Sequence, residues 1–469
     1  MSEPLRENPI GDVDSYKTSH FLQYPPKMTG MYSYLESRGG MFDRTVFFGL
    51  QYLIVRYLQA LVTTADIDEM DTFCRLHGVP FPRKGMERIR DLGYFPVRIK
   101  AVREGTVVPV NNVLVTVEST DPETFWVVGW LETMLMRLWY PITVSTLSWH
   151  CKAEIFRHLL KSSDDPLGEI DFKLHDFGSR GVSSRESAGI GGMSHLVNFK
   201  GSDTIEGIRY ANHYYGTPEG MAAFSIPASE HSTITSWGRE MEVEAYRNMI
   251  KQFAKPGTIV ACVSDSYDLY NVVENLWGDL LHADVARSGA KMVIRPDSGI
   301  PPEVVRTCLQ LLDKKLTLVK NKKGYKVLPA YYGIIQGDGI NYNSIGEILD
   351  EAESKQFSAS NVGFGMGGAL LQKVDRDTQK FAFKCSSGLI DGKWVDVYKD
   401  PVTDPGKRSK RGRLDLVMGP TGPMTVPEGS SDAPSLLHVV YENGKQVGSG
   451  IMLDVVRANA LEPLRAYAR

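Results

Sequence analysis

From about residue 170 to residue 365, short apolar segments alternate with longer amphipathic ones, and this alternation limits the possible folds more than any other feature. Seven segments have the length and apolar content of buried strands: 172–175, 196–199, 222–226, 259–263, 292–294, 333–335 and 362–364. Five amphipathic segments fit helices: 204–214, 239–253, 267–277, 303–312 and 344–355. This pattern predicts an α/β fold around a parallel sheet, either a (β/α) barrel or a doubly wound layer. No GxGxxG motif opens the run, so a dinucleotide-binding version is less favoured.

Charged residues and glycines follow the predicted strands. Those expected at or just beyond the strand ends are Asp176, Asp203, Glu230, His231, Asp265, Arg295, Asp297, Gly337, Asp338, Gly367 and Gly368. In a (β/α) barrel the carboxyl ends of the strands share one face, and catalytic residues collect there. The sequence therefore predicts a functional site on that face, built from loops that follow several strands.

Two segments carry residue types suited to chemistry. The segment AFSIPASEHSTITSWG places His231 where a strand gives way to a helix, although a structural histidine fits the same pattern. The segment IRPDSG places Arg295 and Asp297 around a proline. A guanidinium can bind phosphate oxygens in a planar fork, and a carboxylate can hold sugar hydroxyls or a magnesium-bound water. A surface ion pair is the alternative interpretation of the second segment.

Two glycine clusters, QGDG and GMGG, follow successive predicted strands, and Arg376 lies a few residues beyond the second. Glycine-rich turns after the last barrel strands commonly bind phosphate, although glycines also serve tight turns. In HDFGSRGVSS, Phe177 offers a stacking face and Arg180 a cation, while Asp203 fits either a binding role or a helix N-cap. Together these residues favour an enzyme that acts on a phosphorylated sugar.

Short β segments occur on both sides of the alternating region. Residues 96–119 are rich in valine and are broken by Glu-Gly and Asn-Asn, which predicts a small antiparallel sheet. From residue 381 the pattern is again β, with a hairpin turn expected at Asn443-Gly444. We therefore expect a discontinuous, β-rich α+β flanking domain (1–165 and 376–469) and a (β/α) barrel-like domain (166–375).

Composition excludes several classes of protein. A formal net charge of −3 over 469 residues argues against a general nucleic-acid binder. The basic run 399–413 fits a solvated loop, a nuclear or nucleic-acid signal, or pyrophosphate capture. Five dispersed cysteines without a CxxC motif are typical of a reducing compartment. We find no signal peptide and no apolar run near the roughly 18 residues of a membrane span, so we expect a cytoplasmic protein.

Eight segments resemble the nicotinamide phosphoribosyltransferase family, in the same order and across nearly the whole chain: DSYK, HDFGSRGVSS, NFKGSDT, IPASEHSTITSWG, VSDSYD, IRPDSG, IQGDG and KDPVTDPGKRSKRGR. The resemblance implies a type II phosphoribosyltransferase fold and a homodimer with active sites at the subunit interface, the flanking domain serving dimerisation. It implies that nicotinamide and phosphoribosyl pyrophosphate give nicotinamide mononucleotide and pyrophosphate. Mg²⁺ is the implied cofactor, and ATP the implied coupling co-substrate.

The same resemblance implies roles for individual residues. Phe177 and Tyr16 of the partner subunit match two faces of a ring sandwich, and Asp203 matches the acceptor of the carboxamide N–H. His231 matches a phosphorylated histidine that Asp265 orients. The expected catalytic set is His231, Asp265, Arg295 and Asp297. The residues matched to phosphate or pyrophosphate are Arg38, Arg180, Arg295, Gly367, Gly368, Arg376, Lys384, Lys399 and Lys407. Those matched to ribose or other substrate contacts are Asp14, Ser225, Asp297, Gly337 and Asp338. No direct metal ligand is assigned, because Mg²⁺ is expected to be held mainly by pyrophosphate and water.

Two other functions stay open at this point. A nicotinate phosphoribosyltransferase would catalyse the same reaction with nicotinate, a carboxylic acid, as substrate. The negative charge of Asp203 argues against this alternative, because it would repel the carboxylate of nicotinate. A non-catalytic binding protein could use the same fold. The retention of His231, Arg295, Asp297 and Asp338 argues against lost catalysis.

Overall fold

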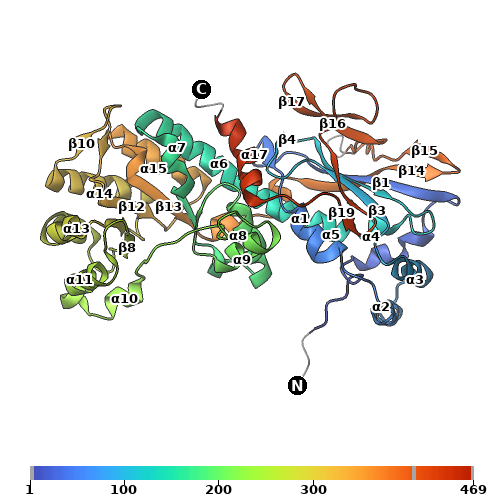
Figure 1. Ribbon diagram of the computed structural model, residues 1–469, viewed down its shortest axis with the longest axis horizontal. Coiled ribbons are helices and arrows are strands. Elements are labelled where there is room, and N and C mark those ends of the chain that lie inside the picture. The colour runs from blue at the N-terminus through green and yellow to red at the C-terminus, as the bar shows by residue number, and fades with distance from the viewer. Residues whose placement is uncertain (1–4, 404–407, 466–469) are drawn as a thin grey trace. The chain divides into compact units, whose positions relative to one another are not determined.

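Figure 1 shows the computed structural model, in which residues 5–403 and 408–465 are described. Contacts between Cα atoms divide the chain into two compact units, each built from two segments. The first unit comprises Met1–Thr146 and Asp375–Ala460, and the second comprises Leu147–Val374 and Leu461–Arg469. The chain passes from the first unit to the second within helix α6 (Trp139–Ser162).

The main sheet of the second unit is parallel, with the strand order β7-β6-β13-β12-β9-β8. Its strands are β6 (Leu174–Asp176), β7 (Gly201–Ser202), β8 (Ile259–Val263), β9 (Lys291–Arg295), β12 (Tyr332–Gln336) and β13 (Val362–Met366). A separate two-stranded ribbon pairs β10 (Val319–Lys320) with β11 (Lys326–Val327). Read from β8, the order follows the chain through β9, β12 and β13 and then returns to β6 and β7. Parallel neighbours of this kind are linked by crossovers that contain helices.

An extended segment after α9 joins the two edges of this sheet. Phe224 forms a parallel bridge with Gly201 of β7, and Ala228 forms one with Ala261 of β8. The strand predicted here is therefore extended chain that pairs at single points, and Pro227 lacks the N–H that a longer ladder would use. The curved parallel sheet confirms the α/β barrel-like prediction.

Helices connect the strands of the second unit. They are α7 (Pro166–Glu169), α8 (Arg185–His195), α9 (Ile205–Tyr214), α10 (His231–Thr235), α11 (Glu242–Phe253), α12 (Leu269–Asn271), α13 (His282–Ser288), α14 (Pro301–Leu316), α15 (Tyr342–Ser354) and α16 (Gly368–Leu371). Four of the five predicted helices are confirmed to within a few residues. The fifth, at 267–277, is the short α12 followed by a π-helix, Val272–Leu280.

The strand predicted at 196–199 is wrong, and a helix that precedes it was missed. Helix α8 ends at His195, residues 196–199 continue as buried turns, and β7 starts only at Gly201. A short buried apolar run does not by itself distinguish helix from strand. The glycines of α8 lower its helix propensity, so the sequence pattern did not predict the helix. They allow α8 to pack closely against α9, since a Cβ on Gly207 of α9 would lie 2.6 Å from the Cα of Gly192.

The main sheet of the first unit draws strands from both ends of the chain, as predicted. Its order is β15-β14-β1-β5-β3-β18-β19, and neighbouring strands are antiparallel. These strands are β1 (Met28–Ser37), β3 (Val97–Ala101), β5 (Val113–Ser119), β14 (Phe381–Ile390), β15 (Lys393–Asp396), β18 (His438–Glu442) and β19 (Lys445–Gln446). The hairpin at Asn443-Gly444 is confirmed, since both residues have positive φ, as a tight two-residue turn requires.

Two smaller ribbons and several helices complete the first unit. The ribbons pair β2 (Arg44–Val46) with β4 (Val107–Pro109), and β16 (Leu414–Gly419) with β17 (Gly422–Pro427). The helices are α1 (Leu50–Leu53), α2 (Thr64–His77), α3 (Arg83–Leu92), α4 (Val127–Trp130), α5 (Glu132–Met136) and, shared with the second unit, α17 (Leu453–Arg465). Among the described residues, no helix combines the length and apolar character that crossing a membrane requires.

Candidate active site

The carboxyl ends of β8, β9 and β12 bring charged side chains together. Arg295 ends β9, and Asp297 follows it by two residues; Asp265 and Asp338 come two residues after β8 and β12. Burial raises the pKa of Asp297, and the negative charges of Asp265 and Asp338 act in the same direction. The positive charges of Arg295 and His231 oppose this rise. The five groups therefore lie close enough to act on one another, at the strand ends where the sequence predicts a site.

His231 is held by Asp265. Nε2 of the imidazole lies 2.9 Å from Oδ1 of Asp265, and Oδ2 of the same carboxylate accepts the backbone N–H of Asp297 at 3.3 Å. The Asp265 side chain is 4% exposed, whereas that of His231 is 47% exposed. An ionised carboxylate only accepts hydrogen bonds, so Nε2 is the donor in this contact, and in the neutral imidazole the lone pair then lies on Nδ1. Asp265 thus fixes the orientation and the tautomer of an accessible imidazole.

The turn before His231 is tied to β8. The backbone N–H of Ser229 donates to the carbonyl of Ala261 at 3.0 Å, and the Ser229 hydroxyl accepts the N–H of Val263 at 2.9 Å. Glu230 is the N-cap of α10, and its N–H donates to the Thr233 hydroxyl at 3.2 Å. The junction between extended chain and helix is where the sequence predicts it.

Arg295 has hydrogen-bonding capacity that the described residues do not use. Its Nη2 lies 3.9 Å from Oδ2 of Asp297, and its Nε is buried without a hydrogen-bond partner among the described residues. A buried unpartnered donor at a charged strand end is suited to a ligand oxygen. The carboxylates of Asp265, Asp297 and Asp338 are hard oxygen acceptors suited to the water ligands of Mg²⁺. Among the described residues they do not form a group whose oxygens all lie within 4.8 Å of one another, so the fit is to a hydrated ion and not to direct coordination.

The ring of Phe177 lies against glycine backbone. A Cβ on Gly365 would lie 1.8 Å from Cε2 of Phe177, and one on Gly337 would lie 3.5 Å from the same atom. The N–H of Phe177 donates to the carbonyl of Met366 at 2.9 Å. The ring also packs against the core cluster of Ala261, Val293 and Ile335. Glycine at position 365 is required because any side chain would displace the ring.

On the sequence-based expectation that Phe177 stacks on a ring of the substrate, the replacement Gly365→Ala should raise the KM for that substrate by about tenfold, because one to two kcal/mol of stacking and packing is lost when Phe177 moves. Steady-state kinetics at saturating co-substrate measures this effect. Gly363→Ala is the matched control on the same strand, since its nearest neighbours lie 3.9 Å from the added Cβ. An unchanged KM in Gly365→Ala would show that the ring position does not matter for binding.

Asp203 and Ser225 face each other across neighbouring segments. The Ser225 hydroxyl donates a hydrogen bond to Oδ1 of Asp203. The backbone N–H of Asp203 donates to the carbonyl of Asp176, the residue that precedes Phe177. The Asp203 carboxylate and the Phe177 ring therefore belong to loops that follow adjacent strands, β7 and β6.

The loop that carries Arg180 touches the second glycine cluster. A Cβ on Gly181 would lie 3.3 Å from the Cα of Gly368, and one on Gly367 would lie 3.7 Å from the carbonyl oxygen of Phe177. Arg180 itself is exposed. The expected phosphate residues Arg180, Gly367 and Gly368 are thus brought together by the loops after β6 and β13.

A cavity of about 560 Å³ inside the barrel was not predicted from the sequence. Its walls include Val293 and Ile335, two members of the core cluster against which Phe177 packs. Lys173 and Lys291 line it as well, and burial lowers the pKa of Lys173 to about 8. The cavity therefore has apolar walls in the core cluster against which Phe177 packs.

The other expected substrate residues that are described belong to the first unit: Asp14, Tyr16, Arg38, Arg376, Lys384 and Lys399. Tyr16 is 60% exposed, and Asp14 accepts a hydrogen bond from Thr133 at 2.7 Å. Arg38 pairs with Glu36 at 2.7 Å, and burial lowers the pKa of Lys384. Lys407 lies outside the described residues.

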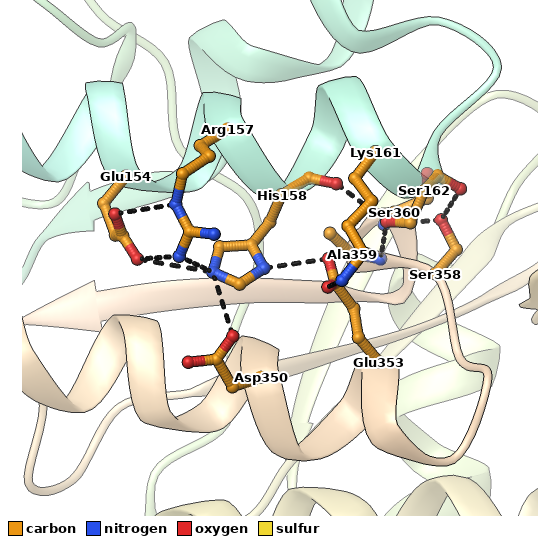
Figure 2. Close-up of polar contacts among 10 residues, drawn as sticks. All are labelled: Glu154, Arg157, His158, Lys161, Ser162, Asp350, Glu353, Ser358, Ala359 and Ser360. Carbon is orange, nitrogen blue, oxygen red and sulfur yellow. Dashed lines mark hydrogen bonds and ion pairs between the residues drawn. The ribbon is translucent and has the colours of Figure 1, made fainter.

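A second polar cluster joins α6 to α15 and was also missed (Figure 2). His158 is fully buried; its Nδ1 lies 2.8 Å from Glu353, and its Nε2 lies 3.3 Å from Glu154. Arg157 and Lys161 contact the same groups, with Arg157 Nη2 2.8 Å from His158 Nε2 and Lys161 Nζ 2.7 Å from Glu353.

This cluster has the ligand types of a metal site. Ligand atoms of His158, Asp350 and Glu353 lie within 4.8 Å of one another. However, the protein's own cations, Arg157 and Lys161, already contact His158 and Glu353. The arrangement is therefore that of an ion-pair network between two helices.

The replacement His158→Ala is expected to lower the unfolding free energy by about 3 kcal/mol at pH 6, because buried carboxylates lose their partner. Burial alone would lower the pKa of His158, but hydrogen bonds to Glu154 and Glu353 outweigh it and raise the pKa. Stabilisation by a raised histidine pKa is complete below the unfolded value near 6.5 and is lost as pH rises through the folded value. Calorimetric melting at pH 6 and at pH 8.5 should therefore show a smaller penalty at the higher pH; an equal penalty would contradict this account.

Solved structures of known proteins share the fold. Nicotinate-nucleotide pyrophosphorylase from Pyrococcus furiosus aligns with a TM-score of 0.64 over 100% of this chain and 99% of its own, at 15% identity. Human nicotinic acid phosphoribosyltransferase aligns with a TM-score of 0.56 over 96% and 93%, at 16% identity. At these identities the likeness establishes the fold alone. This chain therefore has the same fold as these two proteins.

Sequence comparison is more specific. Residues 172–445 match the model of the nicotinate phosphoribosyltransferase (NAPRTase) family, and residues 8–99 match the nicotinamide phosphoribosyltransferase N-terminal domain. The chain belongs to the nicotinate phosphoribosyltransferase family. A protein named nicotinamide phosphoribosyltransferase from Xanthomonas campestris pv. campestris is 52% identical over 98% of both chains. One with the same name from Acinetobacter baylyi is 32% identical over 99% of both. The resemblance stated from the sequence motifs is confirmed.

Proposed function

We propose that this chain transfers the 5-phosphoribosyl group from phosphoribosyl pyrophosphate to nicotinamide. The pyridine nitrogen bonds to the anomeric carbon while the bond from that carbon to a pyrophosphate oxygen breaks, and pyrophosphate leaves with the bonding electron pair. The observation that carries the proposal is the 52% identity to a nicotinamide phosphoribosyltransferase over 98% of both chains. The placement of Asp203 beside the Phe177 loop supports an uncharged pyridine substrate.

In this proposal Phe177 and Asp203 orient the pyridine. The Phe177 ring provides a face for the ring, which becomes cationic as its nitrogen is alkylated, and cation–π attraction contributes about 0.5–2 kcal/mol. The Asp203 carboxylate, oriented by the Ser225 hydroxyl, accepts the carboxamide N–H. A nicotinate carboxylate in the same place would meet a like charge and offer no donor. Correct orientation of the ring nitrogen lowers the entropic part of the barrier.

Charged strand ends bind the phosphoribosyl donor. Arg295 offers its buried Nε to a pyrophosphate or phosphate oxygen, and Arg180 adds a second guanidinium. Asp297 and Asp338 accept hydrogen bonds from ribose hydroxyls. The backbone at Gly367 and its neighbours leaves room for the 5-phosphate. Bound Mg²⁺ would neutralise charge that develops on pyrophosphate, and Asp265 and Asp297 are suited to hold its water ligands.

His231 is the proposed site of ATP-dependent phosphorylation. Asp265 holds the proton on Nε2, so the lone pair of Nδ1 is available to the γ-phosphorus, and ADP leaves with the electrons of the broken P–O bond. The resulting phosphohistidine would couple ATP hydrolysis to synthesis of the mononucleotide.

We further propose a cytoplasmic homodimer in which Tyr16 of the partner subunit covers the second face of the pyridine. The exposure of Tyr16, 60% in the single chain, is compatible with a contact made only in an assembly. The basic residues of the first unit that are assigned to pyrophosphate, among them Arg38 and Lys384, would act at the same interface.

The replacement Asp203→Asn is expected to lower the preference for nicotinamide over nicotinate by about 10–100-fold, since the repulsion of a carboxylate is removed and the acceptor becomes neutral. The ratio of kcat/KM for the two pyridines measures the effect. Asp284→Asn, an exposed carboxylate on α13, serves as the control. An unchanged ratio would favour the alternative, a nicotinate phosphoribosyltransferase, for which the matching family model is named.

A further inference from the structure

Asp176 is a buried carboxyl that the mechanism above does not use. It ends β6, is 0% exposed and lies between the loops that carry Phe177 and Asp203. Its Oδ1 accepts the N–H of Gly178 at 2.7 Å, and its backbone carbonyl accepts the N–H of Asp203 at 3.0 Å. Its Oδ2 is buried without a hydrogen-bond partner among the described residues. A single carboxyl thus joins the loop of the stacking ring to the loop of the amide acceptor.

Among the described residues, Asp203 is the charged group that acts on the pKa of Asp176. Burial, aided by the charge of Asp203, raises the pKa of Asp176 to about 6. The N–H of Gly178 opposes this rise, because it donates a hydrogen bond to the ionised carboxylate. The nearby Thr204 hydroxyl acts in the same direction, although its Oγ1 makes no hydrogen bond among the described residues. Asp176 and Asp203 therefore form a pair of like charges, one buried and one at the substrate surface.

Other titratable groups lie on the elements packed against Asp176. On β6 itself, burial lowers the pKa of His175, and the charge of Asp203 opposes this shift. On α8, His195 is hydrogen-bonded to the carbonyl of Leu174 at 3.1 Å, and Arg185 pairs with Glu206 of α9 at 3.1 Å. The strand partners of Asp176 are the uncharged Ser202 of β7 and Met366 of β13. A change in the charge of Asp176 is therefore felt mainly at Asp203.

We propose that Asp176 is a positioning residue that sets the preference of the site for a neutral pyridine amide over a pyridine carboxylate. The negative charge of Asp176 adds to that of Asp203. The combined charge strengthens a hydrogen bond that Asp203 accepts from a substrate N–H and repels an anionic substituent. The hydrogen bonds of Asp176 to the N–H groups of Gly178 and Asp203 hold the two loops in place, so the distance between the Phe177 ring and the Asp203 carboxylate stays fixed. This inference rests on the proposed function and adds to it a second carboxyl, one that touches no substrate.

The test is the pH dependence of the ratio of kcat/KM for nicotinamide to that for nicotinate. Both pyridines use the same phosphoribosyl donor, so the ionisations of the donor and of bound ATP cancel in the ratio. In the wild type the ratio is expected to fall about three- to tenfold from pH 7.5 to pH 5.5, as Asp176 takes up a proton. In Asp176→Asn, which keeps an acceptor for Gly178, the ratio should be low and flat across this range.

A second variant guards against a folding defect in the first. Thr204→Val removes the hydroxyl that favours the ionised carboxylate, so the midpoint of the fall should move to higher pH while activity is retained. Glu242→Gln is the matched control, because burial also raises the pKa of Glu242. Its Oε1 accepts a hydrogen bond from the Tyr246 hydroxyl on the same helix. Its ratio should follow the wild type at every pH.

The outcomes separate two failures. If active Asp176→Asn and Thr204→Val both follow the wild-type ratio at every pH, the role given to Asp176 is wrong and the proposed function stands. If the wild type converts neither pyridine to its mononucleotide, the proposed function itself is wrong, and the role of Asp176 falls with it.

Discussion

Replacement of Arg295 by alanine is expected to lower kcat/KM for phosphoribosyl pyrophosphate by about 10²–10³-fold, the usual effect of removing one preorganised donor from a developing negative charge. Arg295 is suited to this role because its Nε is buried and has no hydrogen-bond partner among the described residues. Its loss also removes the larger of the two positive charges, Arg295 and His231, that oppose the rise of the pKa of Asp297. The variant should therefore bind phosphate more weakly and have a higher pKa at Asp297.

Steady-state kinetics of purified Arg295→Ala, with the melting temperature as a check on folding, measures this effect. Arg306→Ala is the control, since Arg306 lies on α14 and pairs with Glu351 at 2.8 Å. A loss of less than threefold in a folded Arg295→Ala variant would remove Arg295 from the set of donor ligands.

Replacement of Asp265 by asparagine is expected to slow ATP-dependent phosphorylation of His231 by about 10²–10⁴-fold, as when a catalytic histidine is held in the wrong tautomer. Asp265 accepts a backbone N–H from Asp297 and faces Nε2 of His231. In the variant, the amide oxygen must serve the N–H of Asp297, so the amide NH₂ turns toward Nε2. Nε2 then becomes the acceptor, and the proton moves to Nδ1, where the lone pair is needed.

Incorporation of label from γ-labelled ATP measures the rate. Asp268→Asn is the control, because Asp268 caps α12 three residues further on and asparagine also caps helices. Equal labelling of Asp265→Asn and the wild type would exclude the tautomer argument, and labelling of His231→Ala would exclude His231 as the phosphorylated residue.

The barrel strands and their polar ends could be predicted because the information is local. β8, β9, β12 and β13 are short apolar runs followed by charge or glycine, and parallel strands place all their carboxyl ends on one edge. Helix α8 was missed for a local reason as well, since its glycines lower helix propensity. That helix is stabilised by packing against α9, at a contact between Gly192 and Gly207 that the local pattern does not reveal.

The remaining features depend on residues far apart in the chain. The His158 network joins residues separated by 195 positions, and Phe177 lies on Gly365, 188 positions away. Neither pairing leaves a periodic signal. The sequence resemblance identified Phe177 and His231, but the unpartnered Nε of Arg295 and the buried carboxyl of Asp176 became visible only in three dimensions.

The central claim is tested most directly by supplying the purified protein with phosphoribosyl pyrophosphate, Mg²⁺ and equal amounts of nicotinamide and nicotinate, and measuring both mononucleotides with and without ATP. The account predicts that nicotinamide mononucleotide is the dominant product and that ATP increases its yield. Dominant formation of nicotinate mononucleotide, or no mononucleotide at all, would contradict it.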